Sequence, residues 1–154
     1  MGWLLQHLFG SHNPPTLGAT ISINARPIRV EWTQRAQYEL DHRSLPLVVE
    51  LEVYFSCMVK MNIHFLDAPK INNPTTAVSD KLLIYFRPVT STECSLELGA
   101  RLGRQPEIEL HNNAVAGMVP KYVFLDFKKR KWIGAFSYTV AKNKVVWPLV
   151  ERDR

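Results

Sequence analysis

A stretch of strict alternation at residues 47–66 constrains the fold of this chain more than any other feature. Its ten odd positions are all apolar, and most of its even positions are polar. Side chains of a β-strand point alternately to opposite faces, so the pattern predicts an extended ribbon with one buried face and one wetter face. Val53 and Val59 share the apolar parity, and we expect both in the core.

The length of this stretch limits how it can fold. Twenty residues at about 3.3 Å each would span roughly 66 Å, whereas a globule of this length is roughly 40 Å across. The ribbon must therefore bend, break or pass from one sheet to another. Because a one-residue bulge would exchange the two faces, the unbroken parity favours smooth coiling or a corner near residues 56–58.

The rest of the chain predicts a mostly β fold. Residues 81–88 are apolar on both faces near their middle, which indicates a central strand. Other strand patterns occupy residues 20–24, 28–32, 93–102, 107–111, 121–127, 132–140 and 145–150. We predict about nine or ten strands in an antiparallel sandwich or partly open barrel, with one or two short helices.

Two segments favour helices. Thr33 can cap a helix over residues 33–43, in which Ala36 and Leu40 are four apart and Pro46 lies just beyond the end. At the N-terminus, apolar residues at helical spacing precede a linker with two adjacent prolines. We predict one β-rich domain over residues 1–154, with residues 1–18 as an amphipathic segment and linker that docks on the protein's own core. A partner groove and a membrane surface are the alternatives for this segment.

Composition indicates an ordinary globular protein in a reducing compartment. Apolar residues make up 46% and charged residues 21% of the 154 positions, which fits a single core. Cys57 and Cys94 both lie on apolar faces, so we predict two buried, reduced thiols. The N-terminus has no cationic signal region, and no stretch reaches the roughly 20 apolar residues of a spanning helix. We predict a cytoplasmic protein.

The net charge of +5 belongs to the C-terminal part of the chain. Residues 121–154 carry nine Lys and Arg against three acids, while residues 1–120 carry ten against eleven. Four consecutive cations between two strand patterns predict a basic hairpin tip, and two more follow at the next turn. This candidate polyanion-binding set is Lys128, Lys129, Arg130, Lys131, Lys142 and Lys144.

The arrangement of these cations weakens a single binding patch. If Phe127 faces Trp132, both turns belong to one meander, and consecutive turns of a meander lie at opposite ends. A solvated turn that protects a strand end is then the simpler interpretation.

Catalytic motifs are scarce. Cys57 and His64 have opposite parity, so they do not form a thiol–imidazole pair, and no zinc-binding spacing, phosphate loop or nucleophile elbow occurs. We therefore predict neither cofactor nor metal. The carboxylate pairs Glu50 with Glu52 and Glu107 with Glu109 are expected to be solvated or paired across strands.

Three functional hypotheses follow. The first is a small non-enzymatic β-rich module for protein interaction or assembly, including self-association. The second is nucleic-acid or polyanion binding through the basic C-terminal hairpins. The third is a hydrolase-type enzyme that uses the polar face of the 47–66 stretch, with the candidate residues Glu50, Glu52, Tyr54, Ser56 and His64.

Overall fold

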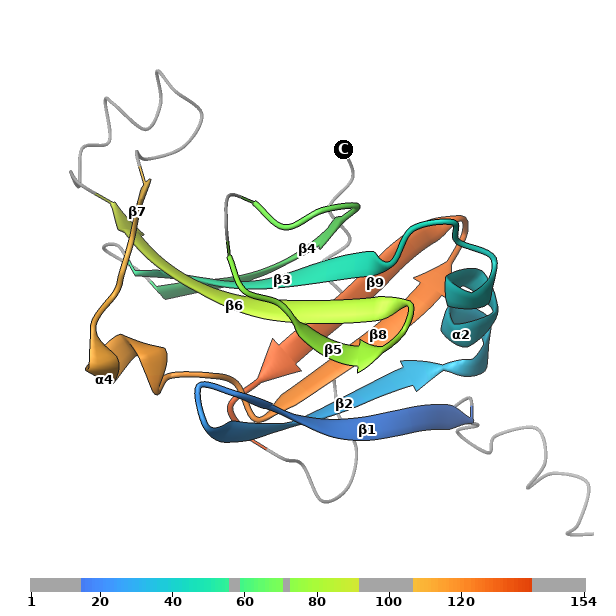
Figure 1. Ribbon diagram of the computed structural model, residues 1–154, viewed down its shortest axis with the longest axis horizontal. Coiled ribbons are helices and arrows are strands. Elements are labelled where there is room, and N and C mark those ends of the chain that lie inside the picture. The colour runs from blue at the N-terminus through green and yellow to red at the C-terminus, as the bar shows by residue number, and fades with distance from the viewer. Residues whose placement is uncertain (1–14, 56–58, 71–72, 92–106, 140–154) are drawn as a thin grey trace, which may run out of the picture.

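Two β-sheets pack face to face in the computed structural model, which describes residues 15–55, 59–70, 73–91 and 107–139 (Figure 1). The four-stranded sheet has the order β1-β2-β8-β9, and the other sheet has the order β4-β3-β6-β5, with β7 paired to β6. Two short helices accompany the sheets. The predicted mostly β sandwich is therefore confirmed.

The bounds of the elements are as follows. The four-stranded sheet contains β1 (Thr16–Ile23), β2 (Arg26–Thr33), β8 (Tyr122–Lys128) and β9 (Lys131–Ser137). The five-stranded sheet contains β3 (Leu47–Phe55), β4 (Val59–Leu66), β5 (Thr76–Ser79), β6 (Leu82–Ser91) and β7 (Glu107–Glu109). The helices are α2 (Gln34–Asp41) and α4 (Asn113–Ala116).

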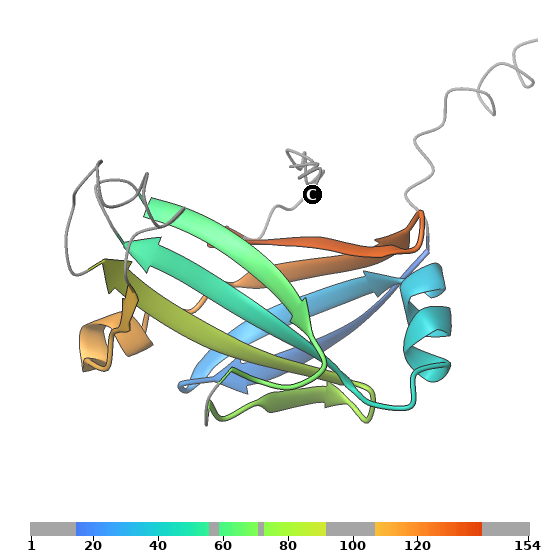
Figure 2. The ribbon, with the colours of Figure 1, turned by 90° about the horizontal axis from the view of Figure 1, so that it is seen from above.

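Each sheet is built from two hairpins placed side by side. In the four-stranded sheet, the hairpins β1–β2 and β8–β9 meet through β2 and β8, which run parallel. In the other sheet, β3–β4 and β5–β6 meet through β3 and β6, which are also parallel. The sandwich is thus mixed rather than wholly antiparallel, and its two facing layers can be followed in Figure 2. The inner strands of each sheet are the most buried.

The 47–66 stretch does not form one bent strand, which corrects our expectation. β3 and β4 lie side by side as antiparallel neighbours, with Phe55 opposite Val59 and Val48 opposite Leu66. Directly opposed residues of an antiparallel pair share a face, so a hairpin centred on residue 57 keeps the odd positions on one side. Alternation alone cannot separate this hairpin from a continuous strand. The sequence between Phe55 and Val59 also lacks the Gly, Pro, Asn or Asp that marks a turn.

Val59 was expected in the core, but the structure places it at the surface. Val53 on the inner strand β3 is 1% exposed, whereas Val59 on the edge strand β4 is 63% exposed. Met61 is also exposed, and only Ile63 and Phe65 of the same face pack against the core. The apolar face of β4 is therefore covered along its second half alone.

The predicted helix after β2 is confirmed. The Thr33 side chain accepts a hydrogen bond from the Ala36 backbone N–H at 3.2 Å, and Ala36 and Leu40 are buried. Thr33 also donates to the Asp126 carboxylate on β8 at 2.6 Å, which ties the start of α2 to the sheet. The helix is therefore held by both its cap and its apolar face.

The C-terminal hairpin is also confirmed. β8 and β9 pair from Tyr122–Ser137 to Lys128–Lys131, and Phe127 lies opposite Trp132 with ring centroids 5.0 Å apart. The turn itself consists of Lys129 and Arg130, both with positive φ.

Two elements were missed, and several predictions fall outside the described ranges. β5 lies in the predicted loop after residue 66, and α4 lies in the predicted loop after residue 111. The segment 1–18 is described only from residue 15; its residues 16–18 belong to β1 and not to a linker, and the rest of its division from the domain stays a prediction. Outside the description are the predicted strands 93–102 and 145–150, Cys57, Cys94, Ser56, Lys142 and Lys144. None of the helices in the described ranges is long and apolar enough to cross a membrane.

We predict that Val53→Asp unfolds the domain and that Val59→Asp does not. A carboxylate without a partner in the core costs several kcal/mol against a typical total stability of about 5–15 kcal/mol. The same substitution at the exposed position should change the free energy of unfolding by less than about 0.5 kcal/mol. Urea denaturation followed by circular dichroism measures both. Equal loss of stability in the two variants would contradict the hairpin.

Candidate functional site

The outer face of the five-stranded sheet carries a buried row of charged side chains. Glu50 and Glu52, in the middle of β3, are 0% and 2% exposed. We expected this face to be wetter. It is buried because Lys70, from the connection between β4 and β5, and the carboxylates of β7 reach over it.

Glu50 is satisfied by side chains from three directions. The Tyr85 hydroxyl on β6 donates to its Oε2 atom, and the Lys70 ammonium donates to Oε1 at 3.1 Å. The His64 Nε2 atom, on the neighbouring strand β4, lies 3.7 Å from the same Oε1. Burial and the hydrogen bond to Glu50 raise the pKa of the Tyr85 hydroxyl above its ordinary range, so this group stays protonated.

Glu52 is held as an anion by its neighbours. Burial alone would raise the pKa of its carboxyl, but His64, Asn62 and Arg87 together lower the pKa to about 2. Asn62 donates to its Oε1 atom at 3.0 Å, and Arg87 donates to Oε2 at 3.0 Å. This carboxylate therefore remains charged at every physiological pH.

Arg87 joins the two strands that flank it. Its guanidinium contacts Glu52 on β3, and it also contacts Glu107 Oε2 at 3.3 Å and Glu109 Oε1 at 2.7 Å on β7. Burial would lower the pKa of Arg87, yet the surrounding carboxylates raise it overall. Burial would likewise raise the pKa of Glu109, but Arg87 and Asn73 lower it. We call this set the Arg87 network; its members are Glu50, Glu52, His64, Lys70, Tyr85, Arg87, Glu107 and Glu109.

Part of the Arg87 network has the composition of a metal site. Ligand atoms of Glu50, Glu52 and His64 lie within 4.8 Å of one another, and carboxylates with imidazole suit several divalent ions. The Lys70 ammonium and the Arg87 guanidinium, however, already contact the two carboxylates. Lys70 contacts the same Glu50 Oε1 atom that faces His64. Arg87 contacts the Glu52 oxygen that does not face His64. Cationic side chains therefore already compensate both carboxylates, and the geometry fits a structural ion network.

The hydrogen bonds of Glu50 and Glu52 weaken the hypothesis of a hydrolase-type site on this face. The structure brings together Glu50, Glu52 and His64, as a site on this face would require. Both carboxylates are buried and bonded to the surrounding side chains, so neither faces a space that a substrate could enter. Tyr54 lies on the same face, and its buried hydroxyl has no hydrogen-bond partner among the described residues.

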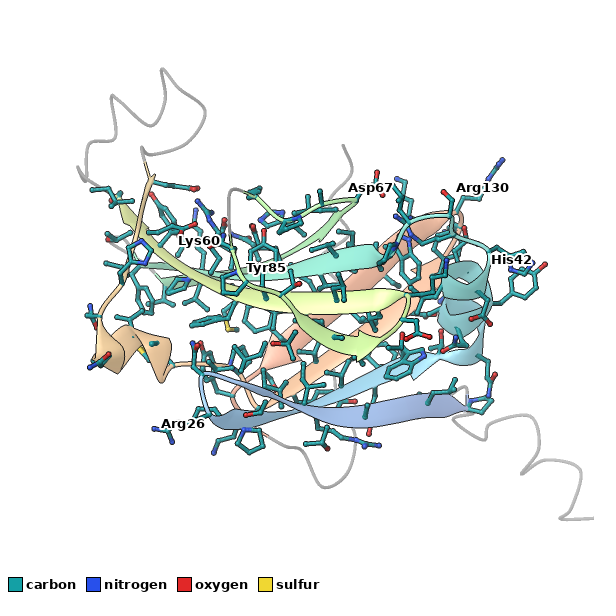
Figure 3. All side chains as sticks on the ribbon, in the orientation of Figure 1. Arg26, His42, Lys60, Asp67, Tyr85 and Arg130 are labelled. Carbon is teal, nitrogen blue, oxygen red and sulfur yellow. The ribbon has the colours of Figure 1, made fainter. Side chains whose placement is uncertain are left out.

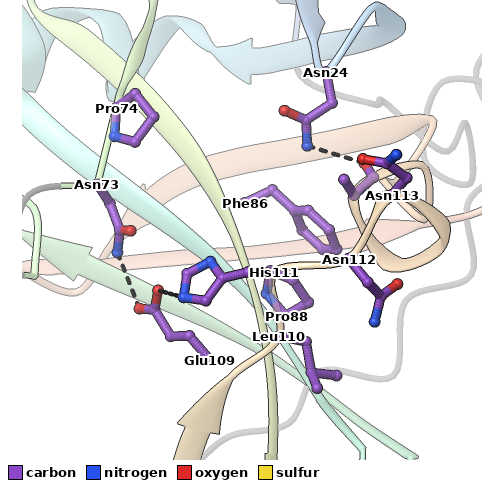
Figure 4. A pocket seen from close by; sticks show the side chains of 11 residues that line it. Asn24, Asn73, Pro74, Phe86, Pro88, Glu109, Leu110, His111, Asn112 and Asn113 are labelled. Atoms are coloured by element: carbon purple, nitrogen blue, oxygen red, sulfur yellow. Dashed lines mark hydrogen bonds and ion pairs between the residues drawn. The ribbon is translucent and has the colours of Figure 1, made fainter.

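A pocket lined by both polar and apolar side chains adjoins the network (Figure 4). It has a volume of about 270 Å³ and lies where the turn between β1 and β2, the strand β6 and the segment from β7 to α4 meet. Glu109 belongs to both features: Asn73 donates to its Oε1 atom at 3.3 Å, and His111 Nε2 lies 3.8 Å from Oε2. We call it the asparagine pocket, defined by Asn24, Asn73, Phe86, Glu109, His111 and Asn113.

The predicted basic residues do not form one patch. Lys128, Lys129, Arg130 and Lys131, which we call the basic tip, are all exposed at the turn of the β8–β9 hairpin. A separate group of cations lines a pocket of about 320 Å³ near the start of β2 and β8; these residues are Arg26, Arg29 and Lys121. Figure 3 places Arg26 and Arg130 at opposite ends of the molecule.

Sequence reasoning named the carboxylates and the histidine of the Arg87 network, but it missed Lys70, Tyr85 and Arg87 and the asparagines of the pocket. The signal for Arg87 was present, because a lone cation inside an apolar central strand is rarely buried without a partner. Glu107 and Glu109 were expected to be solvated or paired across strands, and pairing to Arg87 is what the structure has. Lys70, Asn73 and Asn24 lie in connections between strands, where no periodic pattern of the sequence predicts which residues come into contact.

Comparisons with models of protein families, with curated proteins and with solved structures found no match for this chain. Its function therefore has to be inferred from the geometry of its own residues.

We predict that the stability of the protein falls between about pH 4.5 and pH 2 and that Glu52→Gln flattens this fall. The folded-state pKa of Glu52 is about 2, against an ordinary 4.5. A lowered folded-state pKa adds stability above the unfolded pKa, and this stability is lost as the pH falls through the folded pKa. The loss from this group is on the order of 3 kcal/mol.

Urea denaturation at a series of pH values measures the slope. Glu39→Gln on α2 makes the same chemical change outside the Arg87 network and should keep the wild-type slope. If Glu52→Gln also keeps the wild-type slope, Glu52 is not held as an anion in the folded state.

Proposed function

We propose that this protein is a non-enzymatic assembly module that pairs with a second copy of itself through β1. The observation that carries the proposal is the composition of this strand. β1 is an edge strand of eight residues, Thr-Leu-Gly-Ala-Thr-Ile-Ser-Ile, without a charge or a proline. An open strand of this kind presents unpaired backbone donors and acceptors to another chain.

The outer strands of the five-stranded sheet are protected against pairing, and β9, the second edge of the four-stranded sheet, carries a charge only at its first residue. β4 carries Lys60 and His64, and β9 begins with Lys131. β5 has only four residues and a register shift against β6. Charges, short length and irregularity are the devices by which proteins prevent edge-to-edge pairing. β1 has none of these devices, which supports a role in assembly.

β1 is also complementary to itself. Leu17, Ala19 and Ile21 face the core and are only partly buried. In an antiparallel pair with its two-fold axis at Ala19, Leu17 would face Ile21 of the second copy. Apolar residues then meet apolar residues, and β1 itself brings no charged side chain to the interface; the Arg29 guanidinium of β2, which packs over Gly18, is paired with Glu31. The pairing would extend the four-stranded sheet across both copies.

The Arg87 network supports the non-enzymatic half of the proposal, because Glu50 and Glu52 are buried and bonded to neighbouring side chains. We further propose the cytoplasm as the compartment, on the two cysteines that the sequence places on apolar strand faces.

Charge substitution in β1 tests the assembly. We expect the wild-type protein to form dimers at concentrations up to about 500 μM, well above the Kd of a specific contact. Thr16→Lys with Ser22→Lys should give monomers, because the two ammonium groups would oppose each other across the two-fold axis. Both positions are exposed, so circular dichroism and the melting temperature should stay close to those of the wild type. Sedimentation velocity measures the outcome.

A charge-matched variant makes this test specific. Thr16→Lys with Ser22→Glu introduces opposite charges at the same positions and should retain the dimer. A wild-type protein that stays monomeric over the whole range, or a Lys–Lys variant that still dimerises, would overturn the proposal.

Polyanion binding by the basic tip is the second candidate. Lys129 and Arg130 have φ values of 50° and 63°, a region that favours Gly or Asn. Holding two long cationic side chains there is strained, and strain of this kind is often associated with function. Within the described part of the chain, no carboxylate lies within ion-pair distance of the four cations.

We predict for this candidate that an oligonucleotide binds with strong salt dependence. Replacing the four cations of the basic tip with Gln should lower the slope of log K against log salt by roughly three units. Arg26→Gln with Lys121→Gln removes charge at the opposite end and should leave most of the slope. If the wild-type protein does not bind at about 50 mM salt, the basic tip is a solvated turn.

A further inference from the structure

We propose that the asparagine pocket binds a neutral polyhydroxylated ligand, the size of one sugar ring, as a terminal or single unit of a carbohydrate. The site is separate from the β1 edge, and the inference does not depend on the assembly proposed above. It rests on three properties of the pocket lining: oriented amides, an apolar ring and a compensated charge (Figure 4).

Three amide side chains of the pocket are each oriented by a hydrogen bond within the protein, and each keeps a further donor or acceptor for a ligand. Asn24 donates to the Ala116 carbonyl at 2.9 Å, which leaves its Oδ1 atom as an acceptor. Asn73 donates to the Lys70 carbonyl at 3.0 Å and likewise keeps an acceptor. Asn112, at the rim of the pocket, accepts from Val115 N–H at 2.9 Å and keeps its two amide donors. Fixed donors and acceptors match hydroxyl groups, each of which both donates and accepts.

An apolar surface lies between these polar groups. Phe86 is placed between Asn24 and His111 in Figure 4, and Pro74, Pro88 and Leu110 complete the apolar lining. A sugar ring has hydroxyl groups around its edge and C–H groups on its faces. One aromatic ring with polar groups around it therefore fits such a ligand on both counts.

The charge of the pocket favours a neutral ligand. Glu109 is the carboxylate of the lining, and Arg87 lies behind it at 2.7 Å and compensates its charge. The lining contains neither Lys nor Arg, so a phosphate group would have no fixed cation to contact. The volume of about 270 Å³ is below the roughly 300–1,000 Å³ of pockets for drug-sized ligands. A single sugar ring suits the pocket better than a nucleotide.

Saturation-transfer difference NMR on the full chain tests the proposal. The probes are the methyl glycosides of glucose, galactose, mannose and N-acetylglucosamine, with adenosine monophosphate as the charged comparison. We expect at least one glycoside to show transfer to its ring C–H protons, with a Kd of about 1 mM. Asn113→Ala with His111→Ala should weaken that signal at least about fivefold, a loss of about 1 kcal/mol.

Both substituted side chains line the pocket and are exposed, so the fold should tolerate their loss. His111 is 79% exposed, and the Asn113 side chain makes no hydrogen bond among the described residues. His42→Ala, an exposed histidine at the far end of the molecule, is the matched control and should keep the full signal (Figure 3). No transfer to any glycoside, stronger transfer to the nucleotide, or an undiminished signal in the double variant would overturn the proposal.

Discussion

The contact of Arg87 with three carboxylates is the interaction on which the five-stranded sheet depends. A guanidinium and four carboxylates on one sheet face can leave water only if they satisfy one another, because an unpaired buried charge is very costly. Arg87 sits on β6 and reaches β3 on one side and β7 on the other. It therefore fixes β7 against the sheet, although β7 contains only three residues.

The Arg87 network fixes one wall of the asparagine pocket through Glu109. Glu109 is bonded to Arg87 on one side and to Asn73 on the other, so the wall of the pocket cannot shift without breaking a partly buried ion pair. A polar wall that is bonded on both sides is held rigidly, and a rigid wall is what oriented recognition needs. The two sheets also differ in their outer strands. The five-stranded sheet ends in charged or short strands, whereas the four-stranded sheet ends in the uncharged β1 on one side and in β9, charged only at Lys131, on the other.

Local rules predicted the parts of this fold that local chemistry decides. Thr33 caps α2 because its hydroxyl reaches the Ala36 N–H, and the basic tip lies at a turn because four cations cannot enter a core. The β3–β4 hairpin was misread because its centre at residue 57 preserves the parity of both strands. The parallel pairings arise between hairpins that are far apart in sequence, where no periodicity can report them. The pocket and the Arg87 network combine β3, β4, β6, β7, the start of α4 and three connecting segments, so only the packed structure brings them together.

Hydrogen exchange of the β1 backbone, measured at low and high protein concentration, tests the central claim of self-assembly most directly. An edge strand has amides that point away from its only neighbour, and these exchange quickly in a monomer. If β1 pairs with a second copy, the amides of Thr16–Ile23 that are not bonded to β2 should become protected as concentration rises, while those of β9 should not change. Fast exchange of these β1 amides at every concentration would contradict the account.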